Sequence, residues 1–213
     1  MQAPCLDSTN GRAIFTAMTK GERTHTAILN QATALASQVG LTGLSIGALA
    51  QTLDLSKSGL FAHFQSKEAL QIEVLDHAAA RFSETVLRPA LAQPRGVPRM
   101  QALFDGWIAW VRDEALPGGC VFVAASAELD DQPGPVRDRL VALQQSWVAV
   151  IATSFRKGIE SGLFSADVHP EQFAQDMVGV LLSLHFHSRL LNDAGAEARA
   201  RRAFAALLDG AKP

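Results

Sequence analysis

The chain has 213 residues, of which 48% are hydrophobic and 19% are charged, and its formal net charge is −2. This balance is typical of a soluble folded protein and excludes the disordered and fibrous classes. No apolar run reaches the roughly 18 residues of a transmembrane helix, and the first residues lack the pattern of a secretory signal. We therefore expect a cytoplasmic protein without a membrane partner, in which Cys5 and Cys120 stay reduced.

Charge is unevenly distributed along the chain. Residues 12–67 carry five basic residues against two acidic ones, whereas acidic residues are in excess over residues 68–213. A mildly basic segment on an otherwise acidic chain is the charge pattern expected of a DNA-binding head.

Apolar residues recur with the helical period through most of the chain, and no convincing strand pattern occurs. Residues 1–20 lack this period and are interpreted as a flexible arm. The predicted helices cover residues 28–39, 46–53, 56–64, 67–87, 99–114, 120–129, 135–160, 170–191 and 194–209. Gly40 is expected to end the first helix, and Arg88–Pro89 the fourth, because a proline disfavours helical backbone at the preceding residue. The predicted fold class is therefore all-α, with about nine helices.

Residues 45–64 have the spacing of a helix-turn-helix. The second helix ends near Leu53, and the third begins at Ser56 after a tight connection. Apolar residues such as Leu49 and Leu60 are spaced to pack between the two helices. Such a pair leaves the outward face of its second helix free to enter the major groove of DNA.

The run from Leu53 to Leu70, L-D-L-S-K-S-G-L-F-A-H-F-Q-S-K-E-A-L, resembles the signature of TetR-family transcriptional regulators. That signature reads roughly V-S-K-x-x-L-Y-x-H-F-x-S-K-E-x-L, and the resemblance covers about residues 22–75. It implies a helix-turn-helix DNA-binding domain over residues 21–66, and a larger helical ligand-binding and dimerisation domain over residues 67–213. It also implies DNA contacts at Ser45, Lys57, Ser58, Gly59, Phe61, His63 and Lys67.

The chain departs from the family signature on the third helix. Phe61 replaces the usual tyrosine, and Gly59 and Ala62 are bare where many relatives have a reading side chain. Lys57 is the best candidate for a contact with guanine. We therefore expect few base contacts and a larger share from the DNA backbone and DNA shape. Three further basic residues could add contacts from an N-terminal arm: Arg12, Lys20 and Arg23.

The second domain offers candidates for a small-molecule site. Aromatic and polar residues are placed to line an apolar pocket for an inducer of unknown identity. The candidates are Phe104, Trp107, Trp110, Cys120, Phe122, Trp147 and His185. For each of them, packing in the core is the alternative interpretation.

The last two helices predict a homodimer. Residues 174–191 are apolar nearly all round, and Gly179 and Ser183 permit close approach of another helix. Residues 198–208 are rich in alanine and leucine. A four-helix packing with the same pair of a second copy would bury both segments, and burial within the monomer is the alternative.

These patterns predict a ligand-responsive transcriptional regulator, most simply a repressor. It would bind a palindromic double-stranded operator as a homodimer and be released by a small-molecule inducer, with the fourth helix as the link. No catalytic, cofactor or metal motif was found. Two other hypotheses stay open: a small helical enzyme that uses Cys120 and a histidine, and a ligand-binding module whose DNA-reading helix has degenerated.

Overall fold

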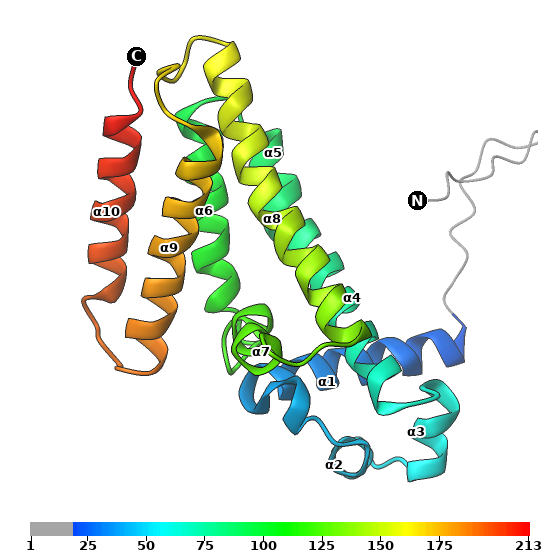
Figure 1. Ribbon diagram of the computed structural model, residues 1–213. Coiled ribbons are helices and arrows are strands. Elements are labelled where there is room, and N and C mark those ends of the chain that lie inside the picture. The colour runs from blue at the N-terminus through cyan, green and yellow to red at the C-terminus, as the bar shows by residue number, and fades with distance from the viewer. Residues whose placement is uncertain (1–18) are drawn as a thin grey trace, which may run out of the picture.

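The computed structural model describes residues 19–213, and all regular structure in this range is helical (Figure 1). The elements are α1 (Lys20–Gly43), α2 (Ile46–Thr52), α3 (Lys57–His63), α4 (Lys67–Phe82), the π-helical turn η1 (Ser83–Leu87), α5 (Arg88–Ala92), α6 (Val97–Val111), α7 (Val121–Leu129), α8 (Pro135–Glu160), α9 (Pro170–Arg189) and α10 (Ala196–Gly210). Since η1 joins α4 to α5 without a break, residues 19–213 form nine separate helices, and the predicted fold class is confirmed. Within this range, no helix combines the length and apolar composition needed to cross a bilayer.

The first three helices begin at hydroxyl caps. Thr19 accepts a hydrogen bond from the Glu22 N–H, and the Glu22 carboxylate accepts one from the Thr19 N–H at 2.7 Å. This capping box starts α1 at Lys20, the last residue of the predicted arm. The rest of that arm, Arg12 included, lies outside the described residues. Ser45 and Ser56 likewise cap α2 and α3, where they accept hydrogen bonds from the Ala48 and Gly59 N–H groups at 3.0 and 2.9 Å.

Gly40 interrupts α1 at the predicted position. Its φ of 76° is a left-handed conformation that favours glycine. A single turn of residues 41–43 then leads to α2. A Cβ atom on Gly40 would also collide with the carboxylate of Glu128 in α7. This corner of α1 is therefore packed closely against α7.

The fourth helix does not end at Arg88–Pro89, so that prediction was wrong. In η1 the hydrogen bonds span five residues, and the Arg88 N–H donates to the Ser83 carbonyl. The wider π turn leads directly into α5, which has Pro89 in its first turn. Because the helix continues through this turn, Pro89 lies inside it and, having no N–H, leaves one backbone hydrogen bond unmade without ending the helix.

Helices α4 to α10 form the body of the molecule. α9 packs against both α8 and α10, and α10 runs antiparallel to α9 at the outer edge (Figure 1). α1 packs against α4 and α7, which joins the three-helix head to the body. The buried apolar residues form one cluster that reaches from Ile28 in α1 to Leu208 in α10. Head and body therefore share a continuous core.

Candidate DNA interface and effector cavity

The head exposes the first turn of α3. Leu49, Leu60 and Phe64 are almost completely buried and hold α2 against α3, as the sequence predicted. Lys57 and Ser58, which begin α3, are exposed. In helix-turn-helix proteins, this end of the second helix is the part that contacts base edges in the major groove.

Lys57 lies across α2. A Cβ atom on Gly47 would stand 3.2 Å from Cε of Lys57 and 3.6 Å from its Nζ. The bare glycine therefore leaves room for the lysine side chain, and the ammonium group lies beside the first turn of α2. A cation in this position can donate to a guanine edge or to a phosphate.

Three other predicted contact residues lie at the caps of α2 and α3. Ser45 is exposed while its Oγ caps α2. The Gly59 N–H donates to the Oγ of Ser56, and the Oγ of Ser58 lies 3.1 Å from that same atom. These hydroxyls are thus held in place by the helix starts that they cap.

The remaining predicted DNA contacts lie toward α4. Lys67 is exposed, and its Nζ donates to the carbonyl oxygen of Thr42 at 2.6 Å. This bond ties the start of α4 to the corner between α1 and α2. His63 is half-buried, with its ring centroid 5.9 Å from that of His25. Phe61 belongs to α3, and its side chain lies outside the described part of the structure.

The body contains a partly open cavity of about 540 Å³, bordered by α4, η1, α6, α7, α8 and α9. Four of the predicted ligand-binding residues line it: Trp107, Cys120, Phe122 and Trp147. Phe82, at the end of α4, packs edge-on against the rings of Trp147 and Phe122, with centroid distances of 5.2 and 6.3 Å. The cavity has the size and the largely apolar walls of a small-molecule site.

Three predicted residues do not line this cavity: Phe104, Trp110 and His185. Phe104 stacks on Phe204 of α10 at 4.1 Å, and Trp110 packs edge-on against Phe82 at 5.3 Å. His185 lies beside Trp107, with a centroid distance of 6.4 Å, and burial lowers its pKa. All three fit the alternative interpretation as packing residues, because neighbouring helices cover the sides to which they point.

Cys120 lines the cavity as an uncharged thiol. Its side chain is buried, and burial raises the pKa of the thiol. Nucleophilic and redox-sensing cysteines need a lowered pKa, since the thiolate is the reactive form. The environment of Cys120 is therefore unfavourable for the chemistry that a cysteine enzyme would require. Within residues 19–213, no group of three or more His, Cys, Asp or Glu side chains is arranged to hold a metal ion.

Three polar residues of the cavity wall, Ser126, Gln144 and Ser146, were not predicted from the sequence. The Gln144 Nε2 donates to the Oγ of Ser126 at 3.2 Å, and the Ser126 hydroxyl donates to the Phe122 carbonyl at 2.7 Å. Gln144 precedes Trp147 by three residues on α8, so the helical period placed it near the predicted wall. Its pairing with α7 depends on how α7 packs on α8, which no local pattern indicates.

Helix α7 connects the cavity to the head. Phe122 and Ser126 lie in the cavity wall. At one end of α7, the Gly118 N–H donates to the Oγ of Ser37 in α1 at 2.9 Å. At its other end, the carboxylate of Glu128 accepts a hydrogen bond from the Thr42 N–H at 3.1 Å. One short helix therefore contacts both the cavity and the end of α1 that leads into α2.

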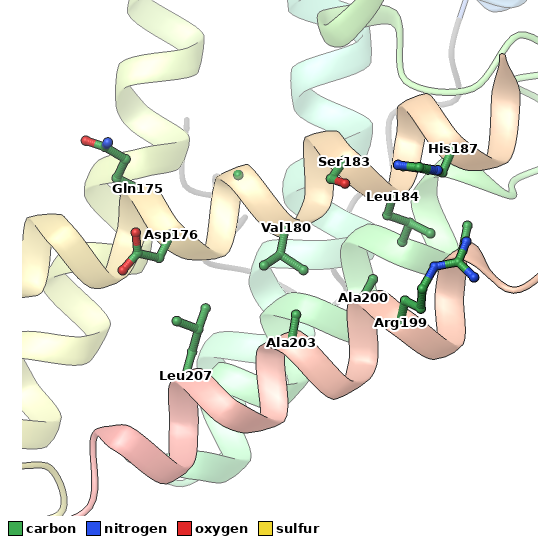
Figure 2. A pocket seen from close by; sticks show the side chains of 12 residues that line it. Gln175, Asp176, Val180, Ser183, Leu184, His187, Arg199, Ala200, Ala203 and Leu207 are labelled. Atoms are coloured by element: carbon green, nitrogen blue, oxygen red, sulfur yellow. The ribbon is translucent and has the colours of Figure 1, made fainter. Parts of the chain in front are cut away.

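A groove of about 710 Å³ runs along the outer side of α9 and α10 (Figure 2). Its floor includes the small residues Gly179, Ser183, Ala200 and Ala203. A Cβ atom on Gly179 would meet no other atom within 4 Å. The groove thus has room for side chains from outside the chain.

The two ends of the groove carry different ionisable residues. Asp176 lies at one end, and Arg199, which forms an ion pair with Asp193, lies beside His187 at the other (Figure 2). Next to the groove, α9 exposes two large apolar side chains: Phe186 and Leu190, with 50% and 68% of their surface accessible. An apolar face of this kind is typical of a protein–protein interface.

Comparison with known proteins confirms the family resemblance. The family model "Bacterial regulatory proteins, tetR family" matches residues 28–74, and "Tetracyclin repressor-like, C-terminal domain" matches residues 96–204, about half of the chain. The repressor DhaR of Mycobacterium sp. (strain GP1) is 25% identical over 140 residues, which cover 65% of this chain and 69% of DhaR. The repressor NemR of Escherichia coli (strain K12) is 23% identical over 158 residues, which cover 73% of this chain and 79% of NemR.

Solved structures share the fold along most of the chain. A TetR transcriptional regulator from Chloroflexus aurantiacus superposes with a TM-score of 0.80 at 26% identity, covering 90% of this chain and 96% of that one. AibR, solved in complex with isovaleryl coenzyme A and operator DNA, superposes with a TM-score of 0.71 at 22% identity, covering 86% and 97%.

Proposed function

Because the chain belongs to the tetR family of bacterial regulatory proteins, we propose that it is a ligand-responsive transcriptional repressor. The proposal rests on one observation: a helix-turn-helix head, in which the first turn of α3 is exposed, shares its core with a body that contains an apolar cavity. AibR, a relative in fold, has been solved with a small molecule and operator DNA together. The head would correspond to residues 21–66 and the regulatory domain to residues 67–213.

We assign DNA reading to the first turn of α3. Lys57 would donate to a guanine edge, and the cap residues would position the head on the phosphates. The proposed contact residues are Ser45, Lys57, Ser58, Gly59, Phe61, His63 and Lys67. Binding to a chromosomal operator would take place in the cytoplasm.

Replacing Lys57 by alanine is expected to weaken binding to the preferred operator by about 1–3 kcal/mol, because one cation at the base edges is lost. The affinity for random duplex should fall less. Fluorescence anisotropy with both duplexes, at several salt concentrations, measures the two effects. Lys157→Ala, which removes an equally exposed lysine from α8, is the matched control and should leave both affinities unchanged. Equal losses on the two duplexes would show that Lys57 contacts phosphate alone.

Effector release would act through two elements. α4 begins in the head at Lys67 and carries Phe82 in the cavity. α7 adds a second connection through Gly118 and Glu128. An effector that separates α7 from α8 would move both the Ser37 and the Thr42 contacts of α1. The spacing of two heads could then no longer match half-sites ~34–36 Å apart.

The test of the whole proposal is a selection followed by a release screen. Duplexes bound by the protein are selected from a random pool, and compounds are then screened for release of the selected duplex. A preferred palindrome bound ~10³-fold tighter than random duplex, and released by a cavity ligand, is the expected result. A protein that selects no sequence would instead have a degenerate reading helix.

We propose that the grooved face of α9 and α10 packs against the same face of a second copy. A two-fold axis through its centre would bring the Asp176 end of one copy to the Arg199 end of the other. The small residues of the floor would allow close helix approach, and the exposed apolar side chains of α9 would be buried. Two helices from each copy would then form a four-helix packing.

Replacing Ala203 by tryptophan should raise the dimer dissociation constant at least about tenfold, or about 1.4 kcal/mol, because the indole would fill the groove. Ala205 is equally exposed on α10 but does not line the groove. Ala205→Trp is therefore the matched control and should dimerise normally. Light scattering after size-exclusion chromatography over a dilution series gives both constants. Equal behaviour of the two variants would place the interface elsewhere.

A further inference from the structure

The cavity walls restrict the charge of the ligand. None of the described side chains that line the cavity is ionisable at neutral pH: apart from Cys120, whose thiol pKa is raised by burial, they are aromatic, aliphatic, amide or hydroxyl groups. Arg81, whose guanidinium lies over the Trp110 ring, already forms an ion pair with Asp113. An ionised ligand would lose its hydration on entering the cavity and would find no opposite charge there. The desolvation free energy therefore strongly disfavours binding of an ion.

The polar pair in the wall restricts the ligand further. The Ser126 hydroxyl donates its hydrogen to the Phe122 carbonyl. Toward Gln144, the Ser126 Oγ can therefore act only as an acceptor. Gln144 must therefore present one N–H to Ser126, which leaves its Oε1 as an acceptor beside its second N–H. Within residues 19–213, no other hydrogen bond engages the Gln144 carboxamide. Oε1 therefore has capacity for a hydrogen bond from a ligand.

We propose that the cavity binds a neutral, largely aromatic molecule with one hydrogen-bond donor, such as a phenolic or alcoholic hydroxyl, which Gln144 Oε1 accepts. The aromatic part would lie among Phe82, Phe122 and Trp147, whose edge-to-face packing already forms an aromatic wall. Gln144 is then a specificity-determining residue. This inference rests on the proposed effector cavity, and it names the chemical class of the effector.

Three probes of nearly equal shape test the inference on the full chain by titration calorimetry at pH 7. 4-Phenylphenol is neutral at this pH, because phenolic pKa values lie near 10; 4-phenylbenzoate is an anion, and 4-methylbiphenyl has no donor. 4-Phenylphenol should bind most tightly, 4-methylbiphenyl about tenfold more weakly for the lost hydrogen bond, and 4-phenylbenzoate at least about 100-fold more weakly.

Variants of two adjacent glutamines locate the donor contact. Gln144→Leu should abolish the preference for 4-phenylphenol over 4-methylbiphenyl while 4-methylbiphenyl still binds. Gln145→Leu, on the exposed side of α8, should leave the preference unchanged. Equal binding of 4-phenylbenzoate, a preference that survives in Gln144→Leu, or no binding of any probe would each overturn the inference.

Operator release is measured separately, with the selected duplex. If 4-phenylphenol binds with the expected selectivity but the duplex stays bound, the ligand class stands and the proposed release fails. If other compounds release the duplex while the selectivity is absent, the repressor function stands and the ligand class fails.

Discussion

Replacing Gly118 by alanine is expected to lower the free energy of unfolding by about 3 kcal/mol, near the upper end for overpacked sites. A methyl group at this position would overlap the backbone carbonyl of Ser37 and approach the Gln38 nitrogen. Backbone atoms cannot rotate away as a side chain can, so α1 and α7 would have to separate. The Gly118–Ser37 hydrogen bond would be lost with them.

Thermal unfolding followed by circular dichroism measures this effect. For a chain of this length, a loss of about 3 kcal/mol lowers Tm by roughly 6–12 °C. Gly210→Ala is the control, since a Cβ atom there meets no other atom within 4 Å. A Gly118→Ala variant that melts within about 2 °C of the parent protein would contradict the close packing of α1 on α7.

Replacing Phe155 by alanine should cost about 3–5 kcal/mol of stability. Phe155 is completely buried on α8 and stacks on Phe173 at 4.1 Å and on Phe164 at 4.4 Å. Removal of the ring leaves a cavity between α8, α9 and the loop that carries Phe164. These segments have little freedom to collapse, because Phe164 already lies against the backbone of Gly158.

Phe155→Leu is the graded control for this site. It keeps most of the buried volume and should cost less than about 1.5 kcal/mol. Chemical denaturation of both variants gives the two free energies. A loss below about 1.5 kcal/mol for Phe155→Ala would mean that the body repacks around the missing ring.

The sequence predicts the helices well, because the signals that start and stop them are local. Ser56 and Gly40 act within three or four residues of themselves. The third helix was predicted to open at Ser56 and the first to end at Gly40, and α3 directly follows Ser56 while α1 is interrupted at Gly40. The end of the fourth helix was predicted wrongly because a proline usually stops an α-helix. A change to five-residue hydrogen bonds lets the chain continue past Pro89.

The cavity was predictable only in part. Trp107 and Trp110 share one apolar stripe of α6, yet only Trp107 reaches the cavity. The contacts of Glu128 with Thr42 and of Gly118 with Ser37 join residues 86 and 81 positions apart. Such contacts depend on how the helices pack together, so a single sequence does not indicate them.

The π turn of η1 has a consequence for the geometry of the whole molecule. Phe82 and Leu87 are five residues apart and both line the cavity. In an α-helix, residues three or four apart share a face, whereas a turn closed by five-residue hydrogen bonds brings positions five apart closer together. The extra residue in this turn therefore resets the rotational phase between the half of the helix that enters the head and the half that supports the body. The orientation of the helix-turn-helix head relative to the body and the shape of the cavity wall thus depend on the same turn.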